Sequence, residues 1–266
     1  MHHGSDYRYV FVCGLHRSGT SLVSRIVSEF PGAGAISHAA VPENEGAYLQ
    51  GAIPHHARSG IPMHFATDPA QHMTEDHPLN RLDTRIRLEQ DWSPWYPPQC
   101  RWRVEKSPVN LIRMRLLQQL FPMAHFIVVL RHPQAVAAAV AKWVDTPVPA
   151  LIDHWLDAHD LALTDMSYLH AVTVIRYEDL VRRPAQVRAG LAAFLDTTAP
   201  DGTNDVIRDG NADYPNPPDM SANQASRAAI WGYGPHCNTD TAWQFAPRHP
   251  LRDIREGVAQ AYSSQD

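Results

Sequence analysis

Residues Tyr9–Val23 read YVFVCGLHRSGTSLV, and they predict a short strand, a tight loop and the start of a helix. The first five residues form a continuous apolar run, as in strands that are buried on both faces. Gly14 and Gly19 bracket the loop, and apolar residues at helical spacing follow it from Leu22 onward. Such a loop aims unpaired backbone N–H groups and the positive end of a helix at one point. The stretch therefore predicts a binding site for a phosphate or sulfate group.

The loop nearly matches the nucleotide-triphosphate P-loop, G-x-x-x-x-G-K-[ST]. Thr20 occupies the position of the P-loop lysine, and the cation lies within the loop instead, as Arg17. A kinase or an ATPase needs that lysine on its β- and γ-phosphates. The loop therefore favours an anion other than ATP with magnesium. The alternative is an ordinary strand-to-helix connection that uses Gly and Ser only for its turn geometry.

The composition is that of an ordinary globular protein. The 266 residues are 44% hydrophobic and 19% charged, with a formal net charge of −5, which argues against a nucleic-acid binder that depends on bulk basicity. No apolar run reaches the length of a transmembrane helix, and the first is too short for a signal peptide. Three cysteines lie far apart in the sequence and are expected to be reduced thiols. We therefore expect a cytoplasmic protein with no membrane span and no nucleic-acid partner.

Histidines are numerous in the middle of the chain, but their spacing matches no standard metal site. The residues concerned are His55, His56, His64, His72 and His77. No cluster of cysteines or carboxylates accompanies them, so we expect pocket or surface histidines and no bound metal.

Strand and helix patterns alternate through the chain as far as residue 195. The expected strands are 102–106, 124–130 and 171–175, and the expected helices are 108–121, 134–143, 148–170 and 178–195, the last as one helix or a pair. Such alternation indicates an α/β fold with a central parallel sheet flanked by helices.

Two regions depart from this alternation. Residues 35–100 are rich in loops, His and Pro, with one or two helices expected within 68–90, and they resemble an insertion that covers a site. Residues 199–266 are irregular apart from a helix expected at 250–262. We expect residues 1–266 to form a single domain in which 199–266 is a C-terminal cover segment.

Basic residues follow three of the expected strands. Arg17 follows the first strand, Lys106 ends the second, and Arg131 follows the third. Ligands of open α/β sheets bind at the carboxyl ends of the strands, so these cations should converge at one edge if the sheet is parallel. Three cations at one edge predict a ligand with several anionic groups.

Four segments resemble signatures of the sulfotransferases. Gly14–Leu22 resembles their phosphosulfate loop, and Val129–Pro133 resembles the second signature, which holds the 3′-phosphate of the donor. Glu105–Pro108 and Ile175–Leu180 match further positions of the family. Together the matches span about residues 9–195, in the order and at the approximate spacing of the family.

This resemblance implies a P-loop-kinase-like fold and the sulfuryl donor 3′-phosphoadenosine 5′-phosphosulfate (PAPS), with the adenosine bisphosphate (PAP) as product. It also implies transfer to a hydroxyl of a small-molecule acceptor with no metal required. The implied donor-binding residues are Arg17, Ser18, Gly19, Thr20, Ser21 and Arg131. Lys106 is implied to lie near the transferred group or the bridging oxygen, and Arg17 and Lys106 are candidate catalytic residues.

The chain departs from the second signature at one position. The family usually places a serine eight residues after the arginine, and this chain has Ala139 there. Another group must then assist Arg131 on the 3′-phosphate. Arg227 and Arg248 in the tail are the candidates.

The general base is also left open. Some sulfotransferases carry a catalytic glutamate in the segment after the first helix, where this chain has His38, Glu43 and Glu45. We rank them Glu43, His38, Glu45, and an exposed loop residue without a catalytic role is the alternative for each. Residues 35–100 are expected to shape the acceptor site.

Two other functions remain open from the sequence. One is a P-loop kinase that acts on a small metabolite, which the missing lysine disfavours. The other is a nucleotide-binding module that keeps the pocket without catalysis, which Ala139 and the unassigned base allow.

Overall fold

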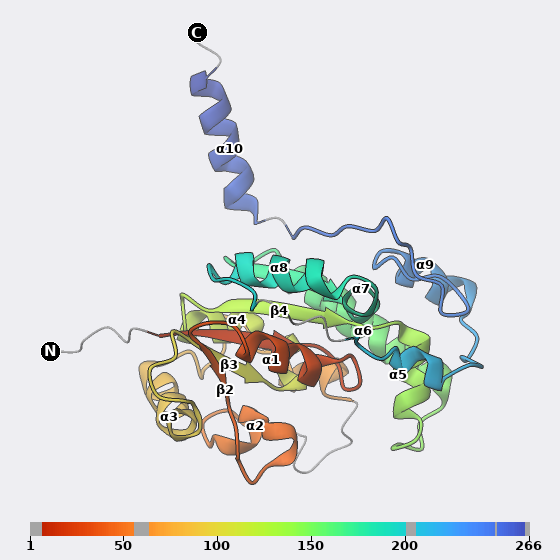
Figure 1. Ribbon diagram of the computed structural model, residues 1–266, viewed down its shortest axis with the longest axis horizontal. Helices are drawn as coiled ribbons and strands as arrows, with labels where there is room; N and C mark the ends of the chain where they lie inside the picture. The colour runs from red at the N-terminus through yellow and green to blue at the C-terminus, as the bar shows by residue number, and fades with distance from the viewer. Residues whose placement is uncertain (1–6, 56–63, 201–205, 248, 264–266) are drawn as a thin grey trace, which may run out of the picture.

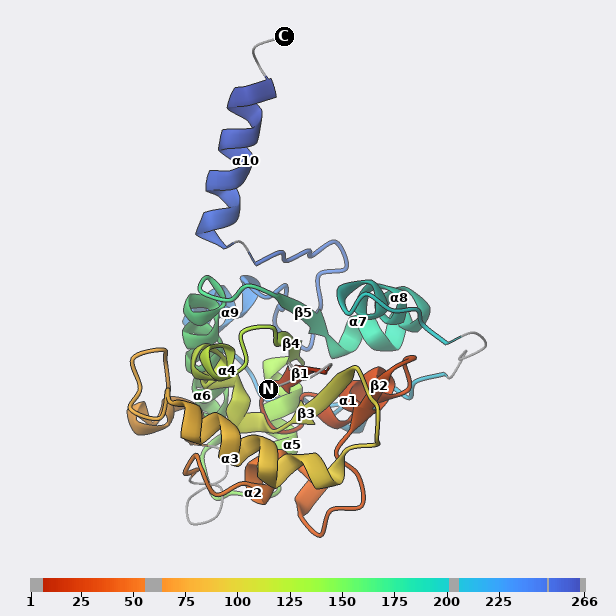
Figure 2. The ribbon, with the colours of Figure 1, turned by 90° about the vertical axis from the view of Figure 1, so that its left-hand side faces the viewer.

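A five-stranded parallel sheet forms the centre of the computed structural model, which describes residues 7–55, 64–200, 206–247 and 249–263. Within these residues the strand order is β2-β3-β1-β4-β5. Figure 1 shows the sheet at the centre of the fold, and Figure 2 labels all five strands. The strands are β1 Arg8–Cys13, β2 Ala33–Ala35, β3 Trp102–Lys106, β4 His125–Leu130 and β5 Val172–Arg176. The α/β fold with a parallel sheet that the sequence predicts is confirmed.

Strand β1 is central, and its alternating side chains supply both cores. Val10 and Val12 pack into one hydrophobic cluster, whereas Tyr9, Phe11 and Cys13 pack into the other. Side chains of a strand alternate between the two faces of the sheet, so a strand covered on both faces must be apolar throughout. This explains the apolar run that opens the fold.

Helices cover both faces of the sheet, as Figure 2 shows. The cluster around Val10 includes residues of α1 Thr20–Ser28, α7 Tyr177–Arg182 and α8 Pro184–Phe194. The cluster around Phe11 is larger. Most of its helical residues come from α3 Leu82–Trp92, α4 Met114–Leu120, α5 Pro133–Val140 and α6 Val148–Met166, and α2 Gly46–Leu49 and α9 Ala222–Ala229 contribute one alanine each.

The strand register brings the carboxyl ends of four strands to one edge. Val12 pairs with Lys106, Cys13 with Val128, and Leu130 with Arg176. The residues that follow β1, β3, β4 and β5 therefore lie beside one another.

Two expected helices are interrupted. The expected helix 108–121 is a 3₁₀ helix, Pro108–Ile112, followed by α4, because Arg113 takes a non-helical backbone conformation (φ −127°, ψ 6°). The segment 178–195 is a pair, α7 and α8, because Arg183 precedes Pro184 and proline disfavours the helical conformation of the residue before it.

The region 35–100 contains short helices and few regular elements. The sequence predicts one or two helices within 68–90, and the structure has α3 Leu82–Trp92 and the 3₁₀ helix Pro69–Gln71, besides α2 Gly46–Leu49. The edge strand β2 just before this region was not predicted, because its sequence, Ala-Gly-Ala, has no apolar run.

The C-terminal segment crosses the carboxyl edge of the sheet before leaving the domain. It contains the 3₁₀ helix Gly210–Asp213, α9 Ala222–Ala229 and α10 Pro250–Ser263. The helix expected at 250–262 is thus present, and it projects away from the other helices in both ribbon views (Figures 1 and 2). No described helix is both long and apolar enough to span a membrane.

Candidate active site

The loop between β1 and α1 is shaped by glycines at positions that other residues do not tolerate. Gly14 has φ +155°, and a Cβ there would lie 2.6 Å from the carbonyl oxygen of Val129 on the neighbouring strand β4. Gly19 has φ +97° and precedes α1 without a side-chain cap. The first N–H groups of α1 therefore have no capping side chain and are available to an anion.

The cations of three strand ends line one cleft of about 390 Å³. Arg17, Lys106 and Arg131 all contribute to its wall, as the parallel topology predicts. The other lining residues come from the loop, α1, the segment after β2 and the segment after α5: His16, Gly19, Thr20, Ser21, Glu43, Glu45, Pro108 and Trp143. A cleft with three cations beside a helix N-terminus is suited to a ligand with several negative charges.

Lys106 is paired with a carboxylate from the 35–100 region. Its Nζ lies 3.0 Å from Oε1 of Glu45, and both side chains are buried. Burial raises the pKa of Glu45, and the positive charge of Lys106 opposes that rise. The pair therefore holds an ionisable carboxyl next to a cation in the floor of the cleft.

Glu105 fixes the backbone that carries Glu45. Its fully buried carboxylate accepts a hydrogen bond from Gly46 N (2.9 Å), from Ser107 Oγ (2.6 Å) and from the Asn110 side chain. Gly46 has to be glycine, since a Cβ would lie 2.6 Å from Glu105 Oε1. Ala47 N in turn donates to Ser107 Oγ at 3.0 Å. These contacts tie the start of α2 to the end of β3.

Glu43 also lines the cleft. It is exposed, and its Oε2 accepts a hydrogen bond of 3.1 Å from Ser21 Oγ on the first turn of α1. Its backbone has φ +49°, within a short 3₁₀ turn. Glu43 thus joins the anion-binding loop to the 35–100 region.

Arg131 is held by neutral oxygen atoms. Its Nη1 donates to the carbonyl oxygen of Arg17 (2.9 Å), and its Nε donates to Asn211 Oδ1 (2.8 Å). The Nη2 atom is buried and has no hydrogen-bond partner among the described residues. Arg131 therefore keeps its full charge and one free donor for a ligand.

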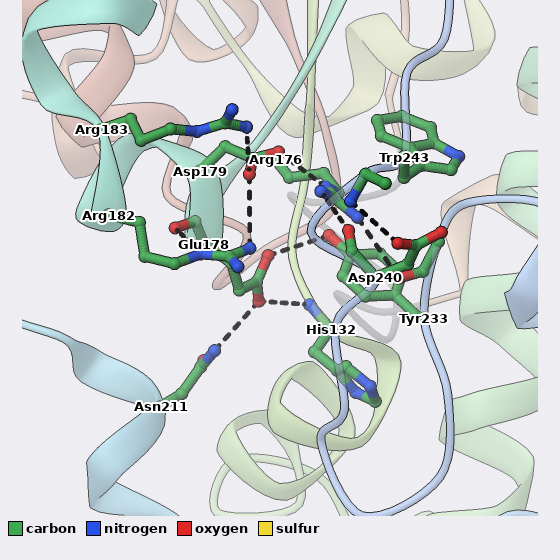
Figure 3. Close-up of polar contacts among 12 residues, drawn as sticks. His132, Arg176, Glu178, Asp179, Arg182, Arg183, Asn211, Tyr233, Asp240 and Trp243 are labelled. Carbon is green, nitrogen blue, oxygen red and sulfur yellow. Dashed lines mark hydrogen bonds and ion pairs between the residues drawn. The ribbon is translucent and has the colours of Figure 1, made fainter.

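The C-terminal segment is anchored beside Arg131 by the carboxylate of Glu178. Figure 3 shows its three contacts: the backbone N of His132 and Asn211 Nδ2, each at 2.9 Å, and the hydroxyl of Tyr233 at 3.0 Å. Because Asn211 also receives the hydrogen bond from Arg131, the C-terminal segment packs beside one of the three cations of the cleft.

Several predicted site residues lie away from the cleft. His38 is exposed and lines neither this cleft nor the neighbouring one. Arg227, predicted to bind the donor, instead pairs with Asp157 and Asp160 of α6, each at 2.6 Å. Ala139 is buried in α5. Arg248 and His56 lie outside the described residues.

Ser18 is a fully buried residue of the loop, and its Oγ has no hydrogen-bond partner among the described residues. It does not line the cleft wall, unlike Thr20 and Ser21.

Sequence reasoning missed two residues that line the cleft, Trp143 and His16, and a third, Asn211, that contacts Arg131 without lining the cleft. Trp143 packs against Arg17, with the guanidinium carbon 5.0 Å from the ring centroid. His16 is largely buried, and burial together with the charge of Lys106 lowers its pKa to about 4, so its imidazole is neutral at pH 7. Asn211 reaches Arg131 from 80 residues further along the chain. The position of His16 within the loop could have identified it as a site residue, whereas no local sequence pattern identifies Trp143 or Asn211.

The described residues contain no group of three or more His, Cys, Asp or Glu side chains that could hold a metal ion. The histidines at 64, 72 and 77 instead make separate contacts. His72 Nε2 lies 2.9 Å from Asp165 Oδ2, and His64 packs against His154.

A central parallel sheet flanked by helices, with a glycine-bracketed loop and a helix N-terminus after its central strand, places the chain in the class of α/β proteins. Within this class the chain belongs to the Sulfotransferase family, whose family model matches residues 9–201. Transfer of a sulfuryl group is the chemistry of this family. The chain matches no curated protein in sequence.

Solved structures similar to this chain are sulfotransferases from bacteria. The sulfotransferase domain of the Synechococcus PCC 7002 olefin synthase is 17% identical over 98% of this chain and 97% of that chain, with a TM-score of 0.48. Sulfotransferase STF1 of Mycobacterium tuberculosis H37Rv is 17% identical over 73% and 69%, with a TM-score of 0.49. A sulfotransferase of Alicyclobacillus acidocaldarius is 16% identical over 84% and 90%, with a TM-score of 0.47. Structural similarity at this level gives no information about the substrate.

Proposed function

We propose that the protein transfers the sulfuryl group of PAPS to a hydroxyl of a small-molecule acceptor and releases PAP. The observation that carries the proposal is the single cleft into which Arg17, Lys106 and Arg131 all project, with one buried nitrogen of Arg131 left without a partner. A donor with an anionic group at each end matches cations at both ends of such a cleft. The absence of a lysine at Thr20 disfavours ATP.

The donor fits the residues that are present. The loop amides, Arg17 and the Thr20 hydroxyl would hold the 5′-phosphosulfate at the N-terminus of α1, where Ser21 would contribute its backbone N–H because its hydroxyl donates to Glu43. Arg131 would hold the 3′-phosphate through its free Nη2. Ala139 offers no hydroxyl to the 3′-phosphate, and Asn211 orients the guanidinium of Arg131 through its 2.8 Å contact with Nε.

When bound, PAPS supplies a sulfuryl group on a good leaving phosphate. The S–O bond to the phosphate breaks, a bond from the acceptor oxygen to sulfur forms, and the acceptor proton must leave. Arg17 and the loop amides stabilise the charge that develops on the departing phosphate oxygen. Lys106 Nζ stabilises the bridging oxygen, and Glu45 holds that amine in position at 3.0 Å.

We propose Glu43 as the base that takes the proton of the acceptor hydroxyl. It is exposed at the mouth of the cleft, and its hydrogen bond to Ser21 orients its carboxylate. Glu45 is a positioning residue, since its carboxylate is buried against Lys106. His38 is left out because it does not reach the cleft.

We further propose that residues 1–266 form one domain, with 35–100 on the acceptor side and 199–266 covering the donor side, and that the protein works in the cytoplasm. Arg227 is not included in the donor site, because two aspartates already neutralise it.

The test combines donor binding with turnover. Calorimetry should show binding of PAP without magnesium, and incubation with PAPS and an acceptor library should release PAP. Replacing Arg17→Ala should lower turnover about 10³-fold, because charge stabilisation of the leaving group is lost. The control is Arg81→Ala, an exposed residue that pairs with Asp83 outside the cleft. Absence of PAP binding would contradict the proposal.

The base assignment has its own test. Glu43→Gln should lower kcat about 10²- to 10³-fold without weakening PAP binding, as expected for a general base. Glu45→Gln should change the pH dependence of kcat as well as its size, because the charge next to Lys106 is removed. If PAP binds but no acceptor is turned over, the protein is a binding module; ATP consumption that requires magnesium would indicate a kinase.

A further inference from the structure

A second cleft, of about 540 Å³, opens beside the donor cleft. The two share Ser21, Glu43 and Lys106, which are the residues next to the proposed point of sulfuryl transfer. Any molecule in the second cleft therefore has direct access to the proposed base and to the transferred group. This cleft does not contain Arg17 or Arg131, so it is not the donor site.

One wall of the second cleft is a polar stripe along α1. Ser21, Ser24, Arg25 and Ser28 all line it, and their spacing of three, four and seven residues places them on one face of the helix. Ser24 is only 8% exposed and lines the cleft, so the accessible part of its side chain is open to a ligand there.

Arg25 is a cation without a counter-ion in the described part of the chain. Its guanidinium is exposed, and no hydrogen bond or ion pair of this group is found there. The nearest acid one helical turn away, Glu29, is occupied by Arg188 at 3.1 Å. Four residues of helix separate Arg25 from Ser21, a rise of about 6 Å. An acidic group bound at Arg25 would therefore lie about one sugar ring from the proposed base.

The opposite wall is narrow and offers further hydrogen-bonding groups. It is formed by β2 and the residues after it, where the small side chains of Ala33–Ala35 leave room for a ligand. Ser37 and Asn44 lie at its edge. The side-chain oxygen of Asn44 accepts from Ala39 N at 3.0 Å, which leaves its NH₂ group to act as a donor.

We propose that this second cleft is the acceptor site and that the acceptor is a small polyhydroxylated molecule with an acidic group. The cleft offers four serine hydroxyls, an amide and an unpaired guanidinium. These groups complement an acceptor with several hydroxyls and one anionic group, and they complement an aromatic or alkyl alcohol poorly. One hydroxyl of the acceptor lies between Glu43 and Lys106. Its oxygen bonds to the sulfur, its proton passes to Glu43, and the sulfuryl group leaves the phosphate oxygen of the donor. This inference rests on the proposed function.

The test uses two acceptors that differ only in the acid: methyl β-D-glucuronide and methyl β-D-glucoside, with 4-nitrophenol as an apolar comparison. At saturating PAPS, the wild-type protein should sulfate the glucuronide with kcat/KM at least 10-fold above that for the glucoside, and 4-nitrophenol least well. Arg25→Gln should bring the two sugars within about 2-fold of each other. Ser24→Val should reduce kcat/KM for both sugars by the same factor, about 10-fold, because it removes a hydroxyl and not a charge.

PAP affinity is measured for every variant and should stay unchanged, and Arg81→Gln is the matched control for loss of a surface arginine. An undiminished preference for the glucuronide in Arg25→Gln would overturn the assignment of the acid site. Sulfation of 4-nitrophenol but of neither sugar would overturn the acceptor class. Failure of the wild-type protein to bind PAP would instead overturn the proposed function, so the two failures are distinguishable.

Discussion

Two arginines at the ends of neighbouring strands show how similar positions can have different roles. Arg176 ends β5 and is fully buried, and each of its three nitrogens has a partner: Asp179 at 2.8 Å, the carbonyl of Gly232 at 3.2 Å and that of Asp240 at 2.8 Å. Figure 3 shows these contacts around the β5 end. Arg131 follows β4, contacts no carboxylate among the described residues and keeps one nitrogen free. The occupancy of the donor atoms, and not the position on the sheet, separates Arg176 from Arg131, for which we propose a ligand.

The largest effect should follow from removing Arg176. Arg176→Leu leaves two buried carbonyls without their donor and leaves Asp179 with only Arg182 and Arg183, so the free energy of unfolding should fall by about 3–5 kcal/mol. Urea unfolding measures this. The control is Arg182→Leu. The contact of Arg182 with Asp179 is on the surface, so its loss should lower the free energy of unfolding by less than about 1 kcal/mol. Equal small losses in both variants would remove the distinction between the two arginines.

Removing Arg131 should affect the ligand more than the fold. Arg131→Leu should weaken PAP binding about 100-fold, or about 2.7 kcal/mol, because a charge-assisted contact to a phosphate is lost. The free energy of unfolding should change by only about 1 kcal/mol, as for loss of ordinary hydrogen bonds. Calorimetry and urea unfolding of the same variant give both values. Unchanged PAP affinity would show that Arg131 is as structural as Arg176.

A smaller effect on stability should come from lowering the pH, which tests the buried histidines rather than the two arginines. Burial lowers the pKa of His125 and His154 to about 4 and that of His159 to about 3. The unfolded chain takes up protons on these groups as the pH falls below about 6.5, whereas the folded chain does not, so stability falls with pH. Between pH 7.5 and 5.5 each histidine should account for about 1 kcal/mol.

Urea unfolding at the two pH values measures this loss. His159→Leu should reduce the loss of unfolding free energy between the two pH values by about 1 kcal/mol. The exposed His38→Gln should leave that loss unchanged. A wild-type protein that is equally stable at both pH values would contradict the assignment of buried neutral histidines.

The parts of the fold that the sequence predicts are those whose signal is local. The apolar runs of β1 and β4 and the glycines of the loop were sufficient to place the sheet and its anion site. Strand β2 was missed because Ala33–Ala35 forms a strand only by pairing with β3. That pairing depends on chain segments far apart in the sequence, and no local pattern reports it.

The residues of the candidate site likewise divide into those that the sequence could identify and those that it could not. Arg17, Lys106 and Arg131 could be found because strand ends and parallel topology dictate their convergence. Arg227 was ranked on its charge alone, and its partners Asp157 and Asp160 lie on a helix whose packing against α9 the sequence did not reveal. Asn211 has no charge and no motif, so only the folded chain shows that it orients Arg131.

The contacts of Glu178 have a consequence for anyone who divides this chain into fragments. The family match ends at residue 201, but two of the three partners of this carboxylate, Asn211 and Tyr233, come from beyond it. A fragment cut at the family boundary would leave Glu178 without these two partners and would expose a negative charge near Arg131, where we propose that an anion binds. We therefore expect a fragment to keep both contacts only if it extends past Tyr233.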